Sequence, residues 1–203
     1  MLFRSKGKDI IHMEVGQPGT PAPKIAKDYI TNEINKNNLG YTVSLGLPSL
    51  RTKISKLYGD WYNLDLNPNR IVVTTGSSGA FILSFSALFD SGDRVGIGSP
   101  SYPSYRQILK SLSLETVDIQ TKLQNRFQPV PEDITNNNLN GILVASPANP
   151  TGSMLDKQSL ENLINTANEN NVSFISDEIY HGIQYENNPT SALEITDNCY
   201  VIN

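Results

Sequence analysis

Short apolar runs alternate with longer stretches of helical periodicity along most of the chain. The apolar runs are rich in β-branched side chains, bounded by turn residues, and occupy residues 71–73, 95–97, 141–144 and 172–175. Runs of this length and composition are typical of buried β-strands. The segments between them have the spacing of helices, which the pattern predicts over residues 78–89, 102–111 and 156–170.

The last of these helices has the most regular pattern. Leu160, Leu163, Ile164 and Ala167 follow the i, i+3, i+4, i+7 spacing of one helix face, and Asp156 stands where an N-cap is expected. Strands that alternate with helices are typical of a mostly parallel sheet with helices on both faces. The sequence therefore predicts an α/β protein with a three-layer α/β/α arrangement.

The first 65 residues follow another pattern. Residues 16–23 are proline-rich and extended, and two helical stretches follow at 23–37 and 48–62. We interpret residues 1–65 as an N-terminal arm with part of a small domain, and residues 66–203 as a larger domain. Residues 198–203 resemble one more strand, after which no closing element follows. We therefore expect the large domain to be incomplete at its C-terminus.

Composition limits which binding partners and which cellular compartment are expected for this chain. The chain is 38% apolar and 18% charged, with a net charge of -4, which is ordinary for a globular protein and argues against a nucleic-acid partner. No apolar run reaches the roughly 18 residues of a membrane span, so no membrane partner is expected. Cys199 is the single cysteine, and His12 and His181 lie far apart, so we expect no metal site and a cytoplasmic protein.

In parallel sheets ligands bind beyond the carboxyl ends of the strands, and unusual residues follow the apolar runs here. A small-residue turn at 74–80 places Ser77 and Ser78 before a predicted helix, where backbone N–H groups and hydroxyls can bind an anion. The same turn is also typical of a serine N-cap. Tyr102 stands between two prolines, which can hold its ring as a stacking surface or use it to close the core.

Two further strand ends carry polar groups. Asn149 precedes Pro150, and its amide can donate to a phenolate or a carboxylate, although Asn-Pro also marks ordinary turns. Asp177 lies three residues before Tyr180. A carboxylate beside a ring nitrogen keeps that nitrogen protonated. Taken singly, Asp177 and Tyr180 equally fit an N-cap and a packed tyrosine, Glu178 is interpreted as structural, and His181 as a rim or packing residue.

The order of these groups is more specific than any one of them. Successive strand ends carry a phosphate-type loop, a rigid aromatic, an amide and an acid-phenol pair, which together suit a flat, polar ring that contains nitrogen. At these residues the chain resembles the class I/II aminotransferases, which are fold-type I pyridoxal-phosphate-dependent enzymes. The strongest marks are Asn149-Pro150-Thr151-Gly152 and Asp177-Glu178-Ile179-Tyr180. Supporting marks are Gly16-Gln17-Pro18, Gly40-Tyr41, Gly46, Leu50-Arg51, residues 76–80 and Pro100-Ser101-Tyr102-Pro103.

The resemblance implies the large-domain fold of these transferases and pyridoxal 5'-phosphate as cofactor. By this resemblance the cofactor phosphate lies on Ser77 and Ser78, Tyr102 stacks on the pyridine ring, and Asp177 pairs with the ring nitrogen. Asn149 and Tyr180 bind the ring hydroxyl oxygen.

The resemblance also extends to the substrate and to a second subunit. It implies that Tyr41 reaches the phosphate in the neighbouring subunit, which makes a homodimer part of the site. Gly16 and Asn149 lie where the carboxylate of the substrate approaches. The implied reaction moves an amino group from an amino acid to a 2-oxo acid.

One expected residue lies beyond the sequence. In the family the Schiff-base lysine follows a strand that resembles residues 199–203, and this chain ends at Asn203. We expect no catalytic lysine in this chain, only the supporting residues Asp177 and Tyr180, and no activity of the fragment alone. Two alternatives stay open, namely a pyridoxal-phosphate-dependent β-lyase of the same fold and a non-catalytic domain that binds the cofactor or another ligand.

Overall fold

The structure, a computed structural model, describes residues 16, 19–36, 40–185 and 187–203. The chain forms two compact units, residues 1–42 and 43–203, and each is described by itself. In the first unit α1 spans Lys24–Ile34, within the predicted helix 23–37. Gly16 and Tyr41 are exposed. Gln17, Pro18, Asn37 and His12 lie outside the described residues, and the predicted division at residue 65 stays a prediction.

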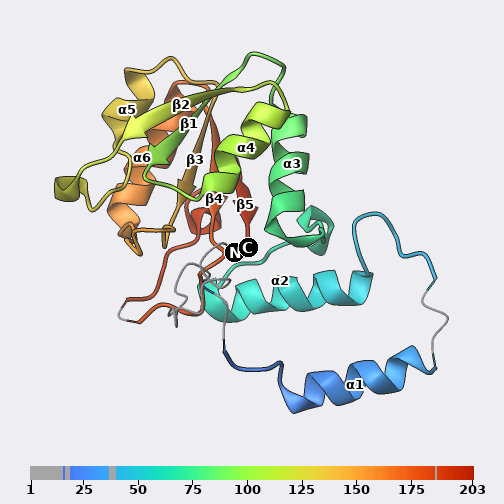
Figure 1. The fold of residues 1–203 in the computed structure, drawn as a ribbon. Coiled ribbons are helices and arrows are strands. Elements are labelled where there is room, and N and C mark those ends of the chain that lie inside the picture. Colours follow the sequence, from blue (N-terminus) through green and yellow to red (C-terminus); the bar gives the residue numbers. More distant parts are fainter. Residues whose placement is uncertain (1–15, 17–18, 37–39, 186) are drawn as a thin grey trace, which may run out of the picture. The chain divides into compact units, whose positions relative to one another are not determined.

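The second unit contains a sheet of five parallel strands in the order β2-β1-β3-β4-β5 (Figure 1). The strands are β1 (Arg94–Ser99), β2 (Glu115–Gln120), β3 (Gly141–Ala145), β4 (Ser173–Asp177) and β5 (Tyr200–Ile202). Four of them confirm predicted strands. From β1 the chain continues to β2 on one side, and the later strands β3, β4 and β5 add on the other side. In sheets of this kind ligands bind at this switch point between β1 and β3, beyond the carboxyl ends of the strands.

Helices cover both faces of the sheet, which confirms the predicted three-layer α/β/α arrangement (Figure 1). The helices of this unit are α2 (Pro48–Tyr62), α3 (Gly76–Leu88), α4 (Pro103–Ser111), α5 (Pro131–Thr135) and α6 (Lys157–Glu169), with short 3-10 turns at η2 (Pro68–Arg70), η3 (Leu123–Asn125) and η4 (Ala192–Glu194). One face packs on α3 and α4, and the other on α5 and α6.

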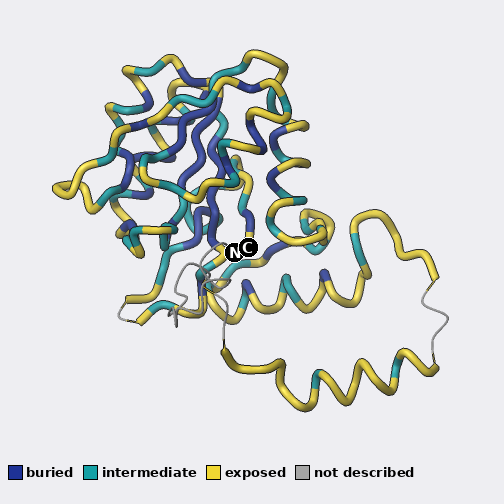
Figure 2. The backbone as a smooth tube through the Cα atoms, viewed as in Figure 1, coloured by how far each residue is buried: buried dark blue, intermediate teal, exposed yellow. Residues whose placement is uncertain are grey.

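The central strands are buried on both sides because their side chains alternate between two cores. Ile142 of β3 belongs to the core beneath α6, whereas its neighbour Leu143 belongs to the core beneath α3 and α4. Phe174 and Ile175 of β4 divide in the same way. Figure 2 shows this buried band running through the sheet. Its rigidity fixes the strand ends at which the predicted site residues lie.

Local signals set the helix ends that position the site. The side chain of Asp156 accepts a hydrogen bond from the Ser159 backbone N–H at 2.8 Å, which confirms the predicted N-cap of α6. Pro48 begins α2, where its fixed φ is tolerated and its missing N–H costs nothing. Asn63 ends α2 in the left-handed conformation, with φ 57°.

The predicted strand at residues 71–73 is wrong. This segment lies outside the sheet, with a backbone hydrogen bond of 3.0 Å from Val73 N–H to the carbonyl of Leu45. Val72 is 49% exposed, so β-branched composition alone did not indicate burial. The edge strand β2 and the short helix α5 were not predicted. In β2 only Ile119 is buried, which leaves the strand without the apolar run of its neighbours.

Two searches of the described residues bear on partners. No described helix has both the length and the apolar character that crossing a membrane requires. Within residues 16, 19–36, 40–185 and 187–203, no group of three or more His, Cys, Asp or Glu side chains is placed to hold a metal ion.

Candidate functional site

The ends of β3 and β4 bring three of the predicted site residues together. Ala145 and Asp177 are register partners, and the backbone N–H of Ser146 donates to the carbonyl of Asp177 at 3.1 Å. The loop after β3 then carries Asn149 to the turn after β4, where its Nδ2 donates to the Tyr180 hydroxyl at 3.3 Å. The amide, the phenol and the acid therefore lie at one edge of the sheet, as parallel strand ends require.

Asp177 is a buried acid. It is 4% exposed, and its Oδ1 accepts the backbone N–H of Ile179 at 3.2 Å. Its Oδ2 accepts a hydrogen bond from the hydroxyl of Tyr105. Burial raises the pKa of Asp177 above its usual range because desolvation disfavours the charged form. No Lys, Arg or His side chain forms an ion pair with Asp177 in the described part of the chain, so a cationic ligand atom would stabilise the carboxylate.

Tyr105, the partner of Asp177, was not predicted as a site residue. It lies in α4, is 2% exposed, and packs edge-on against Phe81 with ring centroids 5.1 Å apart. Burial raises the pKa of Tyr105 above its ordinary value, so its hydroxyl stays protonated and donates the hydrogen bond to Asp177. Its signal in the sequence is its position three residues after Tyr102, which places both rings on one side of the first turn of the helix.

Tyr102 stands at the N-cap of α4 and is 36% exposed. Its ring meets the ring of Tyr105 edge-on, with centroids 5.5 Å apart and an angle of 80° between the planes. Edge contacts of this kind hold an aromatic ring while leaving a face open. Tyr105 therefore contacts both the aromatic residue predicted to stack on the ring and the acid predicted to bind its nitrogen.

The turn before α3 is built to leave its N–H groups available. Gly76 has φ +77°, a left-handed conformation that favours glycine, and α3 begins there. The N-cap residue is Thr75 and not a serine, and no side chain caps the helix. The hydroxyls of Ser77 and Ser78 form no hydrogen bond with another described residue. Uncapped N–H groups at a helix start suit an anion.

Gly16 and Tyr41 belong to the first unit, residues 1–42. Both are exposed. Their predicted contacts with substrate and with the neighbouring subunit stay predictions, as do the roles of the other site residues.

Glu178, the next residue after Asp177, makes a separate set of contacts. It is 1% exposed, and its Oε1 accepts hydrogen bonds from the Ser176 hydroxyl at 2.9 Å and the Ala192 backbone N–H at 2.8 Å. Its Oε2 has no hydrogen-bond partner among the described residues. Burial raises the pKa of Glu178 to about 7. The sequence interpretation of Glu178 as structural fits these contacts, which join β4 to η4.

His181 is also buried, so of the two predicted positions, rim or packing, it takes the second. Its side chain is 0% exposed and lies beneath the loop that follows β3. Burial lowers the pKa of His181, which favours the neutral imidazole at physiological pH.

Open surface, more than enclosed volume, characterises this edge of the sheet. The cavity between the ends of β1 and β3, which Tyr105 and Asn149 help to line, has a volume of about 20 Å³, enough for one water molecule. A larger cavity of about 270 Å³ lies among η3, α5 and α6 and includes neither Asp177 nor Tyr180. The described residues at this edge thus form an open face and not an enclosed pocket.

Comparisons with known proteins bear on the family of the chain. The sequence profile of the family described as aminotransferase class I and II matches residues 8–201. The chain is 40% identical over 199 residues to a valine–pyruvate aminotransferase of Mycobacterium tuberculosis, covering 96% of this chain and 51% of that protein. It is 35% identical over 196 residues to a (5-formylfuran-3-yl)methyl phosphate transaminase of Methanocaldococcus jannaschii, covering 97% of this chain and 50% of that protein.

Solved structures show the same relationship. A protein of Silicibacter pomeroyi assigned as an aminotransferase is 55% identical and superposes with a TM-score of 0.89 over 98% of this chain and 51% of its own. An alanine aminotransferase from Pyrococcus furiosus is 32% identical, with a TM-score of 0.91 over 98% of this chain and 52% of its own. The chain thus spans about half the length of the relatives it matches.

Replacing Tyr105 by phenylalanine should raise the pKa of Asp177 further. The hydroxyl donates to the carboxylate and so favours its charged form, whereas the ring alone keeps the packing against Phe81. Carbon-13 NMR titration of the Asp177 carboxyl measures the effect. Tyr58→Phe removes another buried tyrosine hydroxyl and is the matched control. A pKa of Asp177 that stays the same or falls in Tyr105→Phe would contradict the assigned bond.

Replacing Glu178 by glutamine should change how stability depends on pH. The folded pKa of about 7 lies above the ordinary 4.5, so between these values the native state holds a proton that the unfolded chain has lost. The free energy of unfolding therefore falls as pH rises through this window, by about 3 kcal/mol at most. Glu178→Gln removes this loss, so its advantage over the parent chain should be absent near pH 4 and full above pH 7.

Urea denaturation at a series of pH values measures this difference. His181 has the opposite sign, because its lowered pKa makes the unfolding free energy rise with pH up to its ordinary value. Glu194 adds its charge to the surroundings of Glu178 in both chains. Glu169→Gln, an exposed change in α6, controls for the loss of one charge. An advantage independent of pH would refute the assigned protonation.

Proposed function

The chain belongs to the class I and II aminotransferase family, and we propose that it provides the cofactor-binding wall of a pyridoxal-phosphate-dependent aminotransferase. The complete protein would move an amino group from an amino acid to a 2-oxo acid. The observation that carries this proposal is Asp177, a buried acid at the end of β4 with hydrogen bonds from Tyr105 and Ile179 and no cationic partner among the described residues.

The surroundings of Asp177 fit a protonated pyridine nitrogen. Burying a carboxylate without a counter-charge is costly, and a cationic ring nitrogen would offset that cost by a charge-assisted hydrogen bond. When bound, pyridoxal phosphate supplies a conjugated ring that withdraws electrons from the α-carbon of the amino acid. Asp177 would hold the proton on the ring nitrogen, and Tyr105 would keep Asp177 oriented and charged.

The remaining site residues would fix the ring around this contact. Asn149 and Tyr180, already joined by a hydrogen bond of 3.3 Å, would donate to the ring hydroxyl oxygen. Tyr102 would stack on the ring from its position at the start of α4. The uncapped turn with Ser77 and Ser78 would bind the phosphate through N–H groups and hydroxyls.

Substrate identity is proposed only as a class. The relatives carry names as different as valine–pyruvate aminotransferase and aspartate aminotransferase, so family membership alone does not select one amino acid. Gly16 and Asn149 would lie near the substrate carboxylate. In a homodimer Tyr41 would reach the phosphate site of the partner. Exposed apolar side chains on α3, Ile82 at 44% and Leu83 at 56%, would suit cover by a second chain.

We further propose that this chain does not contain the Schiff-base lysine. Within the described residues no lysine side chain has a hydrogen bond or ion pair with Asp177, Asn149 or Tyr180. A β-lyase of the same fold would use the same cofactor residues. Amine transfer to a 2-oxo acid, assayed against pyruvate release from a cystathionine-like substrate, would distinguish the two reactions in the complete protein.

Asp177→Asn should weaken binding of pyridoxal phosphate to this chain by roughly ten- to a hundredfold. The amide keeps the shape and loses the charge, and hydrogen bonds to charged groups are worth about 1.5–3 kcal/mol. Titration with pyridoxal phosphate, followed by the absorbance of the cofactor, measures the affinity. Asp118→Asn, at an exposed acid paired with Arg106, is the matched control and should bind as the parent chain does. Equal affinity in the Asp177 variant would refute its proposed role.

Borohydride treatment of the chain with bound pyridoxal phosphate should leave no lysine adduct at the strand-end site. Reduction traps a lysine only where a Schiff base forms, and the proposed site has no such residue. Mass spectrometry of the digested protein locates any adduct. A stoichiometric adduct at one lysine, together with measurable transamination, would overturn the proposal that this chain alone is inactive.

A further inference from the structure

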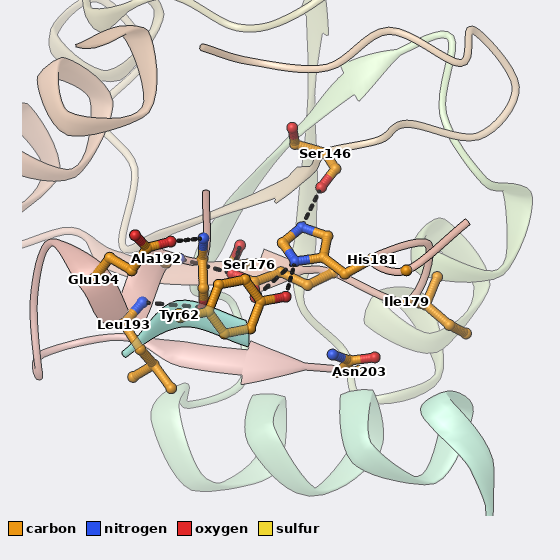
Figure 3. Close-up of polar contacts among 12 residues, drawn as sticks. Tyr62, Ser146, Ser176, Ile179, His181, Ala192, Leu193, Glu194 and Asn203 are labelled. Carbon is orange, nitrogen blue, oxygen red and sulfur yellow. Dashed lines mark hydrogen bonds and ion pairs between the residues drawn. The ribbon is translucent and has the colours of Figure 1, made fainter. Parts of the chain in front are cut away.

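The imidazole of His181 joins the two loops that carry the candidate site. Its Nε2 lies 2.9 Å from the carbonyl oxygen of Ser146, and its Nδ1 lies 2.6 Å from the hydroxyl of Tyr62. Figure 3 shows the ring between these two partners, with Ser146 on one side and Tyr62 on the other. His181 itself belongs to the turn after β4, held by a backbone bond of 2.9 Å to the carbonyl of Glu178. One ring therefore links this turn, the loop after β3 and the end of α2.

The partners fix which nitrogen carries the proton. A backbone carbonyl can only accept, so Nε2 of His181 must donate to Ser146. In the neutral ring Nδ1 then has a lone pair, and the Tyr62 hydroxyl donates to it. Burial raises the pKa of Tyr62 and lowers that of His181, so both groups keep these roles at neutral pH. The Ser146 carbonyl thus selects the Nε2–H tautomer, and the Tyr62 hydroxyl, which can donate or accept, donates to the free Nδ1.

Glu178 is the acid that faces this ring. Its Oε2 lies 3.6 Å from Nδ1 of His181, beyond hydrogen-bond distance, and is otherwise without a hydrogen bond to a described residue. With its raised pKa, Glu178 is partly protonated at neutral pH and draws less charge onto the ring than an ordinary carboxylate would. The ring is therefore arranged as a neutral connector and not as an ion-pair partner.

Ser146 is the point where the bond acts on the site. Its N–H donates to Asp177, its hydroxyl accepts the Leu155 backbone N–H at 2.9 Å, and its carbonyl accepts from His181. The loop that follows is closed by bonds from Ala148 N–H to Ser153 and from Gly152 N–H to Ala148. These three anchors, together with the bonds of 3.1 Å from Gln128 Nε2 to the carbonyls of Ala145 and Ser153, hold the base of a closed loop whose tip carries Asn149.

We propose that His181, whose ring is held by Tyr62 at Nδ1 and donates from Nε2 to Ser146, is a positioning residue that sets Asn149 against Tyr180. Without the ring, the Ser146 carbonyl is buried and unpaired, and the loop is anchored to β4 by the backbone bond to Asp177 alone. The loop then moves relative to the turn that carries Tyr180, and the 3.3 Å contact between amide and phenol loosens. This proposal rests on the proposed function for its consequence in cofactor binding, although not for its geometry.

Three variants separate positioning from simple packing. His181→Gln keeps an amide nitrogen near the place of Nε2 and restores the donor to Ser146. His181→Phe keeps a ring and removes both polar contacts. Tyr62→Phe leaves His181 and removes only the hydroxyl that bonds its Nδ1. The matched control for the last change is Tyr58→Phe, one turn earlier in α2, whose hydroxyl accepts from Asn203 at 3.4 Å and does not contact His181.

Amide hydrogen exchange in the cofactor-free chain measures the loop directly. For Ala148 and Gly152, whose bonds close the loop, exchange should be roughly tenfold faster in His181→Phe, the cost of one lost hydrogen bond. It should stay within about threefold of the parent in His181→Gln and be intermediate in Tyr62→Phe. Exchange in β1 (Arg94–Ser99) reports global destabilisation and is subtracted. Tyr58→Phe should leave the loop unchanged.

Nitrogen-15 NMR of the His181 ring gives a readout that packing alone would not move. The parent chain should show a protonated Nε2 and an unprotonated Nδ1, and Tyr62→Phe should move the Nδ1 resonance because that nitrogen loses its hydrogen bond from the hydroxyl. A ring protonated at Nδ1 in the parent, failure of glutamine to restore slow exchange, or unchanged loop exchange in His181→Phe would each overturn the proposal. If His181→Phe does not fold, loop exchange in Tyr62→Phe and the Nδ1 shift of its His181 ring decide the question.

Pyridoxal phosphate binding then separates this proposal from the proposed function. His181→Phe should bind the cofactor roughly tenfold more weakly, and His181→Gln within about threefold of the parent. If the parent chain does not bind the cofactor at all, the proposed function fails, and loop exchange with the tautomer still decides the role of His181. If the parent binds and His181→Phe binds equally well despite a loosened loop, positioning by His181 is refuted.

Discussion

The burial of the Asp177 carboxylate at the end of β4 constrains everything around it. A charge in that position loses its hydration, and no described cation replaces the lost water. The protein compensates with two hydrogen bonds, one from the backbone of Ile179 and one from the phenol of Tyr105. These bonds orient the carboxylate without neutralising it. An oriented, incompletely compensated acid at the carboxyl end of a parallel strand is suited to a cationic ligand atom.

The two neighbouring acids at this sheet edge, Asp177 and Glu178, have different roles. Asp177 receives the phenol of Tyr105 from α4, whereas Glu178 turns to Ser176, to the backbone of η4 and to β5, where its N–H bonds Ile202 at 2.8 Å. With a pKa of about 7, Glu178 can hold these elements in its neutral form. A group that bonds three neighbouring segments stabilises the frame, and one with an uncompensated charge is available to a ligand. Adjacent positions in the sequence thus have unrelated chemistry.

Much of this frame follows from local sequence patterns. Doubly buried strands have continuous apolar runs, which is why β3 and β4 could be predicted, and Asp156 caps α6 as its position indicates. The convergence of Asn149, Asp177 and Tyr180 follows from a general property of parallel sheets, whose strand ends share one edge. The strand β2 could not be predicted in this way, because an edge strand needs only one buried side chain.

The unpredicted contacts share one property, namely that each depends on a partner far away in the sequence. Tyr105 meets Asp177 across 72 positions, and Tyr62 meets His181 across 119. Taken alone, a tyrosine at the end of a helix indicates only packing, since no local pattern encodes what its hydroxyl will meet. The predicted site residues that converge, Asn149, Asp177 and Tyr180, are therefore those that follow predicted strands. The residues that hold them in place, such as Tyr105 and Tyr62, can be identified only from the packing of the helices against the sheet.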